Sequence, residues 1–393
     1  MQSSKTTEWE EAYFHLARKK FAAFYLRFAQ ATAEHSTLEA EYLNLLEIAS
    51  FYRVNRDYSS LIALHEKLHP FMDLRGHWDD SITILDWVIE AATEMENHTN
   101  SARFTHDKAD ILNQSGDFKE AETLYIKSEQ IYTDIENVEM ALRSRHMRSM
   151  VVRAQGNLDE AERLSESVIG EANKQELIAW LAHPYYVRAL IARDKGDYSR
   201  ARYWIEQSIP KLSQPEDLGM IAQCYHFLGE LEFLQKNYIG ARSHLETSLK
   251  LSRDVGILRR IAATKRLLGD VARLQGFYEE ASAYYSAALK LLQDLGDRPQ
   301  VSRTLLSFGQ LEFERKSWEE AIEYFVQAKR SYQGLEDSRG VVAACFFLLR
   351  VYIYKRNLFW AINELIDSIE AGFRGRLFSY KVIIGALKRW GRW

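Results

Sequence analysis

The chain has 393 residues, of which 47% are hydrophobic and 27% charged, and its formal net charge is −4 at pH 7. This balance excludes an intrinsically disordered chain, and the net charge excludes a polycation that binds nucleic acid over its whole surface. Only 5 prolines and 19 glycines occur, which favours helices throughout. The two cysteines form no metal-binding pair, and the sequence contains neither a signal core nor an apolar run of about 18 residues, so we expect a cytoplasmic protein.

In chain order, residues 1–55 are expected to form a helical entry or cap. Over residues 56–371 one turn then recurs every forty residues, as in SGDFKEAE (115–122) and QGFYEEAS (275–282). Its glycine, or the residue that replaces it, lies at positions 76, 116, 156, 196, 236, 276, 316 and 356. Glycine ends a helix cheaply in the left-handed conformation; where Lys236 and Arg356 replace it, we expect the adjacent Asn237 and Asn357 to take that role.

Small residues occupy two further columns of this repeat. Alanine follows seven of the turns, at 121, 161, 201, 241, 281, 321 and 361, with Ser81 after the first; small residues precede the turns at 109, 149, 189, 229, 269 and 309, until Leu349 in the last copy. Small residues at both positions let two helix backbones pass closely. Apolar residues at helical spacing fill the intervening segments. The pattern predicts an all-α fold, a right-handed α-solenoid of about eight or nine antiparallel helix pairs.

The clearest copy carries Leu268, Gly269, Gly276, Tyr278, Ala281, Tyr285 and Ala288. This pattern resembles the tetratricopeptide repeat, in a forty-residue form similar to that of kinesin light chains and of the sensor arrays in bacterial NB-ARC/STAND ATPases of the maltose-regulator type. Residues 42–92 resemble the entry to the array in those ATPases. Their phosphate-binding loop GxxxxGK[ST] does not occur in this sequence. The resemblance therefore implies a sensor or adaptor array without the ATPase.

One enzyme motif is present, because His65-Glu66-Lys67-Leu68-His69 matches H-E-x-x-H. On a helix its histidines could bind zinc with Glu66 as the base, so a zinc-dependent hydrolase is an alternative function. The apolar ridge of this segment explains the same residues as a packed repeat helix, which Pro70 is expected to bend or end. We therefore expect a protein that is not an enzyme and that has no catalytic residue, metal or cofactor.

In tetratricopeptide arrays the first helix of each pair lines the concave groove, and the resemblance carries this face over column by column. The candidate ligand-binding residues are Arg103, His106, Asp110, Asn113, Arg143, His146, Arg153, His183, Tyr186, Arg193, His226, Glu230, Phe233, Arg266, Asp270, Arg273 and Arg303. Such a basic face with aromatic residues suits an acidic protein or peptide segment, or an anionic small molecule. Single-stranded nucleic acid is a further alternative, which the net charge makes the less favoured one. The histidines predict binding that weakens as the pH rises through their titration range.

The last predicted region, residues 372–393, is a basic amphipathic tail without an acidic residue. Every repeat array must cover its exposed end, so we expect the tail to act as a cap. Contact with a membrane surface through residues 372–393 is the less favoured alternative. The sequence thus predicts a non-catalytic scaffold or ligand-sensing module of signal transduction.

Overall fold

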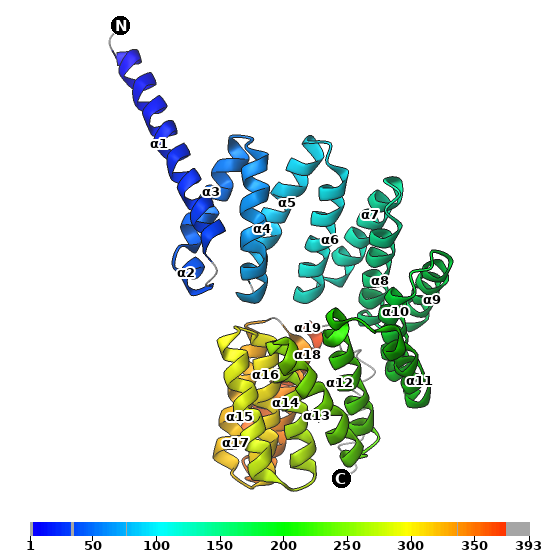
Figure 1. Cartoon of the computed structure of the whole chain (residues 1–393). Coiled ribbons are helices and arrows are strands. Elements are labelled where there is room, and N and C mark those ends of the chain that lie inside the picture. The colour runs from blue at the N-terminus through cyan, green and yellow to red at the C-terminus, as the bar shows by residue number, and fades with distance from the viewer. Residues whose placement is uncertain (1–2, 33–34, 76, 336, 375–393) are drawn as a thin grey trace. The chain divides into compact units, whose positions relative to one another are not determined.

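The computed structural model describes residues 3–32, 35–75, 77–335 and 337–374, and within these ranges the chain forms helices and no β-strand (Figure 1). The predicted all-α solenoid of helix pairs is confirmed. The chain divides into two compact units, Met1–Lys211 and Leu212–Trp393, which we call unit 1 and unit 2. Most of the predicted tail, residues 375–393, lies outside the described residues.

Unit 1 contains eleven α-helices among its described residues. They are α1 (Ser3–Ala31), α2 (His35–Ala40), α3 (Tyr42–Val54), α4 (Tyr58–Arg75), α5 (Trp78–Glu94), α6 (His98–Ser115), α7 (Phe118–Asp134), α8 (Val138–Ala154), α9 (Leu158–Lys174), α10 (Ala182–Asp194) and α11 (Tyr198–Ser208). Two short 3₁₀ turns, η1 (Ala179–Leu181) and η2 (Ile209–Lys211), flank the last pair. None of the described helices of the chain is both long and apolar enough to cross a membrane.

Unit 2 begins with the 3₁₀ turn η3 (Pro215–Asp217) and continues with helix pairs of nearly constant length. They are α12 (Leu218–Leu234), α13 (Tyr238–Val255), α14 (Leu258–Leu274), α15 (Tyr278–Asp294), α16 (Arg298–Glu314), α17 (Trp318–Gln333), α18 (Ser338–Tyr354) and α19 (Leu358–Arg374). We call the even-numbered helices from α4 to α18 first helices, because each precedes the recurring turn. Those that follow the turn, from α5 to α19, are second helices.

The helices end at a left-handed residue that recurs every twenty residues. Glycine adopts this conformation at 116, 156, 196, 256, 276 and 296, and other residues adopt it at 56, 96, 136, 176, 236, 316 and 356. The turn residues Lys236 and Arg356 are therefore left-handed themselves. The expectation that Asn237 takes this role is wrong, because Asn237 has φ −84° and its side chain caps α13 by accepting a hydrogen bond from the Gly240 N–H. An asparagine one residue after the turn stabilises the structure more by capping the next helix than by adopting the left-handed turn conformation itself.

Position 216 breaks this series among the described residues, and prolines explain the break. Three of the five prolines, Pro184, Pro210 and Pro215, lie in the α10–α11 repeat and the segment after it. A proline lacks the N–H of a helical hydrogen bond and restricts the residue before it. The two helices of this repeat have 13 and 11 residues, whereas first helices α12, α14, α16 and α18 have 17 each. The division between the two units falls at this irregular repeat.

The small-residue columns let first and second helices pack closely in unit 2. A Cβ atom added to Gly269 would lie 2.5 Å from the Tyr285 ring, and one added to Gly309 would lie 2.5 Å from the Phe325 ring. Neither distance is compatible with real van der Waals contact, so glycine is required unless a ring moves. The facing alanines, such as Ala281, have no exposed surface.

Candidate functional site

The predicted site lies on first helices that contact their neighbours in the array. In unit 1 helix α8 contacts α10, and in unit 2 helix α12 contacts α14, α14 contacts α16 and α16 contacts α18. Side-chain hydrogen bonds also join α4 to α6 and α6 to α8. The predicted residues are therefore brought together within each unit. We call this set of side chains, taken unit by unit, the first-helix face.

Three of the four face arginines in unit 1 pair with an acid, two of them with an acid of a neighbouring first helix and one with an acid of its own helix. Arg103 donates to Glu66 of α4 at 2.6 Å, and Arg153 donates to Asp194 at the end of α10 at 2.5 Å. Arg193 shares Asp194, at 2.9 Å. The pairs of Arg103 and Arg153 join adjacent repeats, and all three ion pairs reduce the positive charge that the sequence predicts for this face.

The histidines of the face are buried or half-buried and serve the packing between first helices. His106 lies 3.0 Å from the Ser144 hydroxyl of the next first helix, and His226 lies 3.0 Å from the Thr264 hydroxyl. Burial lowers the pKa of His146 and of His226 to about 3, and it also lowers the pKa of His106. These three rings are neutral at neutral pH, so they add no positive charge to the face there, and the pH dependence of binding stays a prediction.

Two of the three carboxylates of the face are held by tyrosines of the second helices. Tyr125 donates its hydroxyl to Asp110, and Tyr285 donates to Asp270 at 2.7 Å. Burial is the main cause that raises the pKa of both tyrosines, so each remains a donor. Asp110 and Asp270 lie four repeats apart and make the same contact, which is structural.

In unit 2 the remaining predicted residues form a mixed polar and aromatic surface. Arg266 donates to Asp270 at 2.9 Å, and Arg273 pairs with Glu314 of the next first helix. Phe233 packs on Tyr238 with 6.1 Å between ring centroids. The other predicted residues of the face, Asn113, Tyr186 and Glu230, are half-buried.

Two arginines differ from the rest. Arg143 of α8 and Arg303 of α16 are exposed, and neither forms an ion pair with any residue that the structure describes. They occupy the same position of the forty-residue repeat, one in each unit. Because neither is held in an ion pair, they are the cations of the first-helix face best placed to bind an anion from outside.

The sequence reasoning missed Trp180, which lies in the turn η1 before α10. Its ring is 5.7 Å from that of His146 and 5.9 Å from that of His183, between ring centroids. These three rings form a half-buried aromatic cluster beside the Arg143 helix. Trp180 precedes Pro184, which shortens the following helix in an otherwise regular repeat. A tryptophan at such an irregular point was the one feature of the sequence that could have indicated Trp180 as a site residue.

The H-E-x-x-H residues lie inside α4, and that helix continues through Pro70 to Arg75 rather than ending there. Pro70 is exposed, so water can bond the carbonyl that its ring leaves without a donor. The rings of His65 and His69 lie 5.2 Å apart, and His65 is buried against Phe104. Within the described part of the chain, no three His, Cys, Asp or Glu side chains come together as a metal site requires.

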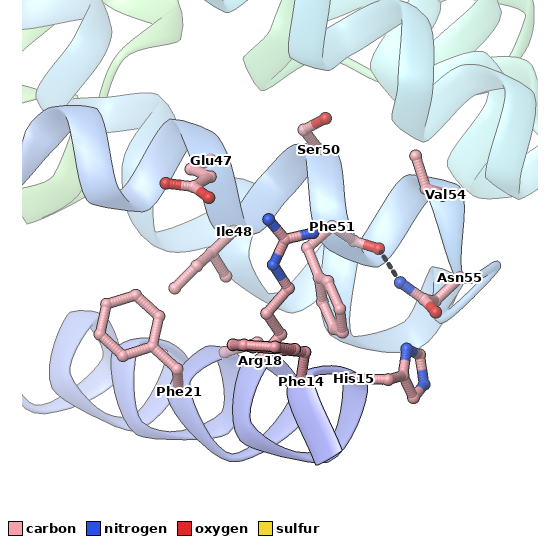
Figure 2. Close-up of a pocket in the computed structure, with 11 residues that line it drawn as sticks. Phe14, His15, Arg18, Phe21, Glu47, Ile48, Ser50, Phe51, Val54 and Asn55 are labelled. Carbon is pink, nitrogen blue, oxygen red and sulfur yellow. Dashed lines mark hydrogen bonds between the residues drawn. The ribbon is translucent and has the colours of Figure 1, made fainter. Parts of the chain in front are cut away.

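A concave site that the sequence did not predict lies between α1 and α3 in unit 1 (Figure 2). Its volume is about 520 Å³, within the usual range for a binding cleft. The apolar part of the lining comes from Phe14, Phe21, Ile48, Phe51 and Val54. Residues 1–55 carry no repeat pattern, so nothing there marked which side chains would face each other.

Comparisons with known proteins agree with this fold. The tetratricopeptide repeat family model matches residues 260–334, which covers the α14–α17 region. A search of curated protein sequences found no match.

Several solved structures share the fold at low sequence identity. A STAND signal transduction ATPase with a tetratricopeptide repeat sensor, from Pyrococcus horikoshii, is 14% identical with a TM-score of 0.53; the match covers 95% of this chain and 54% of that one, so this chain spans about half its length. A Rap protein complexed with competence and sporulation factor is 13% identical with a TM-score of 0.51, covering 84% of this chain and 99% of the other. The apo quorum sensor NprR from B. thuringiensis is 14% identical with a TM-score of 0.52, covering 84% and 93%. Residues 260–334 thus match the tetratricopeptide repeat family, and the helix pairs and these neighbours show that the chain shares the tetratricopeptide-like helical solenoid fold, in forty-residue repeats.

Proposed function

We propose that this chain is a non-catalytic binding module whose first-helix face holds an acidic segment of a protein or peptide partner. The observation that carries the proposal is made in each unit separately: Arg143 in unit 1 and Arg303 in unit 2 are exposed and form no ion pair with a described residue, whereas the other arginines of the face are paired with an acid. An arginine fork binds a carboxylate through two hydrogen bonds and keeps its charge at every physiological pH.

Aromatic side chains on the same first helices as these cations, or packed against those helices, support the same proposal. Trp180 and His183 lie near His146 on the α8–α10 side of unit 1, and Phe313 stacks under Arg350 at 4.9 Å in unit 2. An acidic segment with apolar neighbours would use both kinds of contact. The Rap and NprR neighbours are consistent with this, since one is a complex with competence and sporulation factor and the other is a quorum sensor.

The proposal also includes the division of the chain into regions, its location and its role. We retain residues 1–55 as an entry region, 56–371 as the repeat array and 372–393 as a tail or cap. We also retain a cytoplasmic location and a role in signal transduction. An anionic small molecule is the second ligand class that the two arginines would accept.

The test is capture of partners from the native cell by the wild-type chain and by a double variant, Arg143→Ala with Arg303→Ala. Loss of a charged hydrogen bond weakens binding by about tenfold for each arginine, so the double variant should retain little of the partner. The captured segment, made as a synthetic peptide, should bind the wild type and should lose affinity when its Asp and Glu residues become Asn and Gln.

The matched control is Arg163→Ala with Arg253→Ala, which removes the same charge from exposed positions on the second helices α9 and α13. This control should capture the partner as the wild type does. Equal capture by all three proteins would place the site elsewhere, and capture abolished by ribonuclease would show that the face binds RNA instead.

A further inference from the structure

Each wall of the cleft between α1 and α3 carries a row of lining side chains at helical intervals. Phe14, Arg18 and Phe21 lie on α1 at intervals of four and three residues, so they share one side of that helix. On α3 the lining residues include Ile48, Phe51 and Asn55, at intervals of three and four. Both ridges face the same cleft in Figure 2. Two parallel ridges at this spacing leave a groove into which the ridge of a third helix fits.

Apolar side chains around the cleft remain exposed, in addition to those that α1 buries when it packs on its neighbouring helices. Phe14 is 66% exposed and Val54 is 77% exposed, and both line the cleft. On α1, Tyr13, Leu16 and Phe24 are also exposed. A cluster of exposed aromatic and aliphatic side chains on neighbouring helices is typical of an interaction surface.

The polar residues of the cleft carry opposite charges on its opposite walls. Arg18 rises from α1 and Glu47 lies on α3, and neither forms an ion pair with any described residue (Figure 2). An occupant that lies between the walls therefore meets a cation on one flank and an anion on the other. Charges at the rim of an interface select partners and fix their orientation.

We propose that the α1–α3 cleft binds one amphipathic α-helix of a partner protein. Its apolar ridge would lie on Phe14, Phe51 and Val54, an acidic residue on one flank would face Arg18, and a basic residue on the other flank would face Glu47. This is the helix-in-groove mode of recognition. It is independent of the first-helix face, since none of these residues belongs to that face.

The test uses the full chain and three labelled synthetic peptides of about 18 residues, long enough to form a helix. All three carry the same leucine ridge; one has Glu on one flank and Lys on the other, the second has Glu on both flanks and the third has Lys on both. Fluorescence anisotropy should show the mixed peptide binding most tightly, because each of the others places one like charge against a wall. Reversing the mixed helix in the groove exchanges its flanks, so one of its two orientations satisfies both walls whichever flank carries Glu.

Two substitutions of matched exposure separate the cleft from the rest of α3. Val54→Asp places a charge in the cleft and should weaken the mixed peptide by about tenfold or more. Leu43→Asp places the same charge on the same helix, at a residue that is 79% exposed and does not line the cleft, and it should leave binding unchanged. Both side chains are exposed, so neither change removes core packing.

A third variant tests the charge pattern directly. Arg18→Glu makes both walls acidic, so it should reverse the order of preference and favour the peptide with Lys on both flanks. The proposal is overturned if the three peptides keep the same order in this variant, if Leu43→Asp weakens binding as much as Val54→Asp, or if none of the peptides binds. Concentration-dependent dimerisation of the wild type that Val54→Asp abolishes would also overturn it, because a second copy would then cover the cleft.

Discussion

The helix pairs α6–α7 in unit 1 and α14–α15 in unit 2 occupy equivalent positions of the repeat, four copies apart. Both hold an aspartate of the first helix with a tyrosine of the second, Asp110 with Tyr125 and Asp270 with Tyr285. They differ beside that contact, because unit 1 has the neutral His106 where unit 2 has Arg266. The shared hydrogen bond from tyrosine to aspartate holds the two helices of each pair together. The residue beside it, His106 or Arg266, determines the charge of the first-helix face.

The largest difference between the two helix pairs is expected in the free energy of unfolding when each aspartate is replaced by alanine. Asp270 is buried and pairs with Arg266, so Asp270→Ala should lower the free energy of unfolding by about 3–5 kcal/mol by leaving a charge without its partner. Asp110→Ala should lower it by only about 1–3 kcal/mol, because the hydrogen bond from Tyr125 is the main interaction that this substitution removes. Urea denaturation of both variants measures the difference. Equal effects would show that the Arg266 ion pair adds nothing to the shared bond.

Acid should destabilise unit 1 more than unit 2. Burial lowers the pKa of His65 and His146 in unit 1 to about 3, and that of His226 in unit 2 likewise. Histidine in the unfolded chain titrates near 6.5, so between pH 6.5 and 3 the unfolded chain binds more protons than the folded one. Stability is therefore complete above about pH 6.5 and decreases as the pH falls.

At pH 5 each such histidine lowers stability by about 2 kcal/mol, and unit 1 has two of them. Hydrogen exchange at pH 7 and pH 5, corrected for the intrinsic rate, should show that protection decreases first in α4 and α8. His226→Gln should reduce the acid sensitivity of unit 2 alone. An equal decrease of protection in both units would contradict the burial of these rings.

A smaller difference is expected in the small-residue column. Gly269→Ala places a methyl group against the Tyr285 ring and should destabilise unit 2 by about 1–3 kcal/mol. The equivalent residue of unit 1 is Ala109, whose buried methyl packs near Tyr125, so Ala109→Gly should cost about 1 kcal/mol of helix propensity and about 1 kcal/mol more for the lost methyl. Thermal unfolding checks both. A neutral Gly269→Ala would mean that the tyrosine ring can move aside.

The smallest effect is expected at the ion pairs along the turns. Arg315 donates to Glu279 at 2.6 Å, but Glu279 is almost fully exposed. Arg315 also pairs with the buried Glu312, so the exposed partner is the one to remove: Glu279→Ala should lower the free energy of unfolding by less than about 1 kcal/mol, and by less still at high salt. An effect as large as that of Asp270→Ala would contradict the ranking of buried over exposed charges.

The forty-residue period was sufficient to predict the helix pairs and the columns of the first-helix face. It did not predict which arginines remain uncompensated, because the acid that neutralises Arg153 is Asp194, which lies forty-one residues away in a column without a turn signal. It also did not predict that Lys236 would take the left-handed turn conformation itself. The repeat is enforced by backbone geometry, whereas charge compensation depends on single side chains.

Regions outside the period were the least predictable. The α1–α3 cleft depends on how a non-repeating helix lies against α3 and α4, and no column in the sequence aligns Phe14 with Phe51. Trp180 faces His146 because prolines shorten the α10–α11 repeat. Tertiary packing decided these positions, so local pattern could not reveal them.

The central claim is that first helices, and not second helices, form the surface that holds the partner. Hydrogen exchange of the full chain with and without its captured partner tests this most directly. Slower exchange in α8 or α16, around Arg143 or Arg303, with α9 and α17 unchanged, is the predicted result. Slower exchange confined to the second helices would contradict the account.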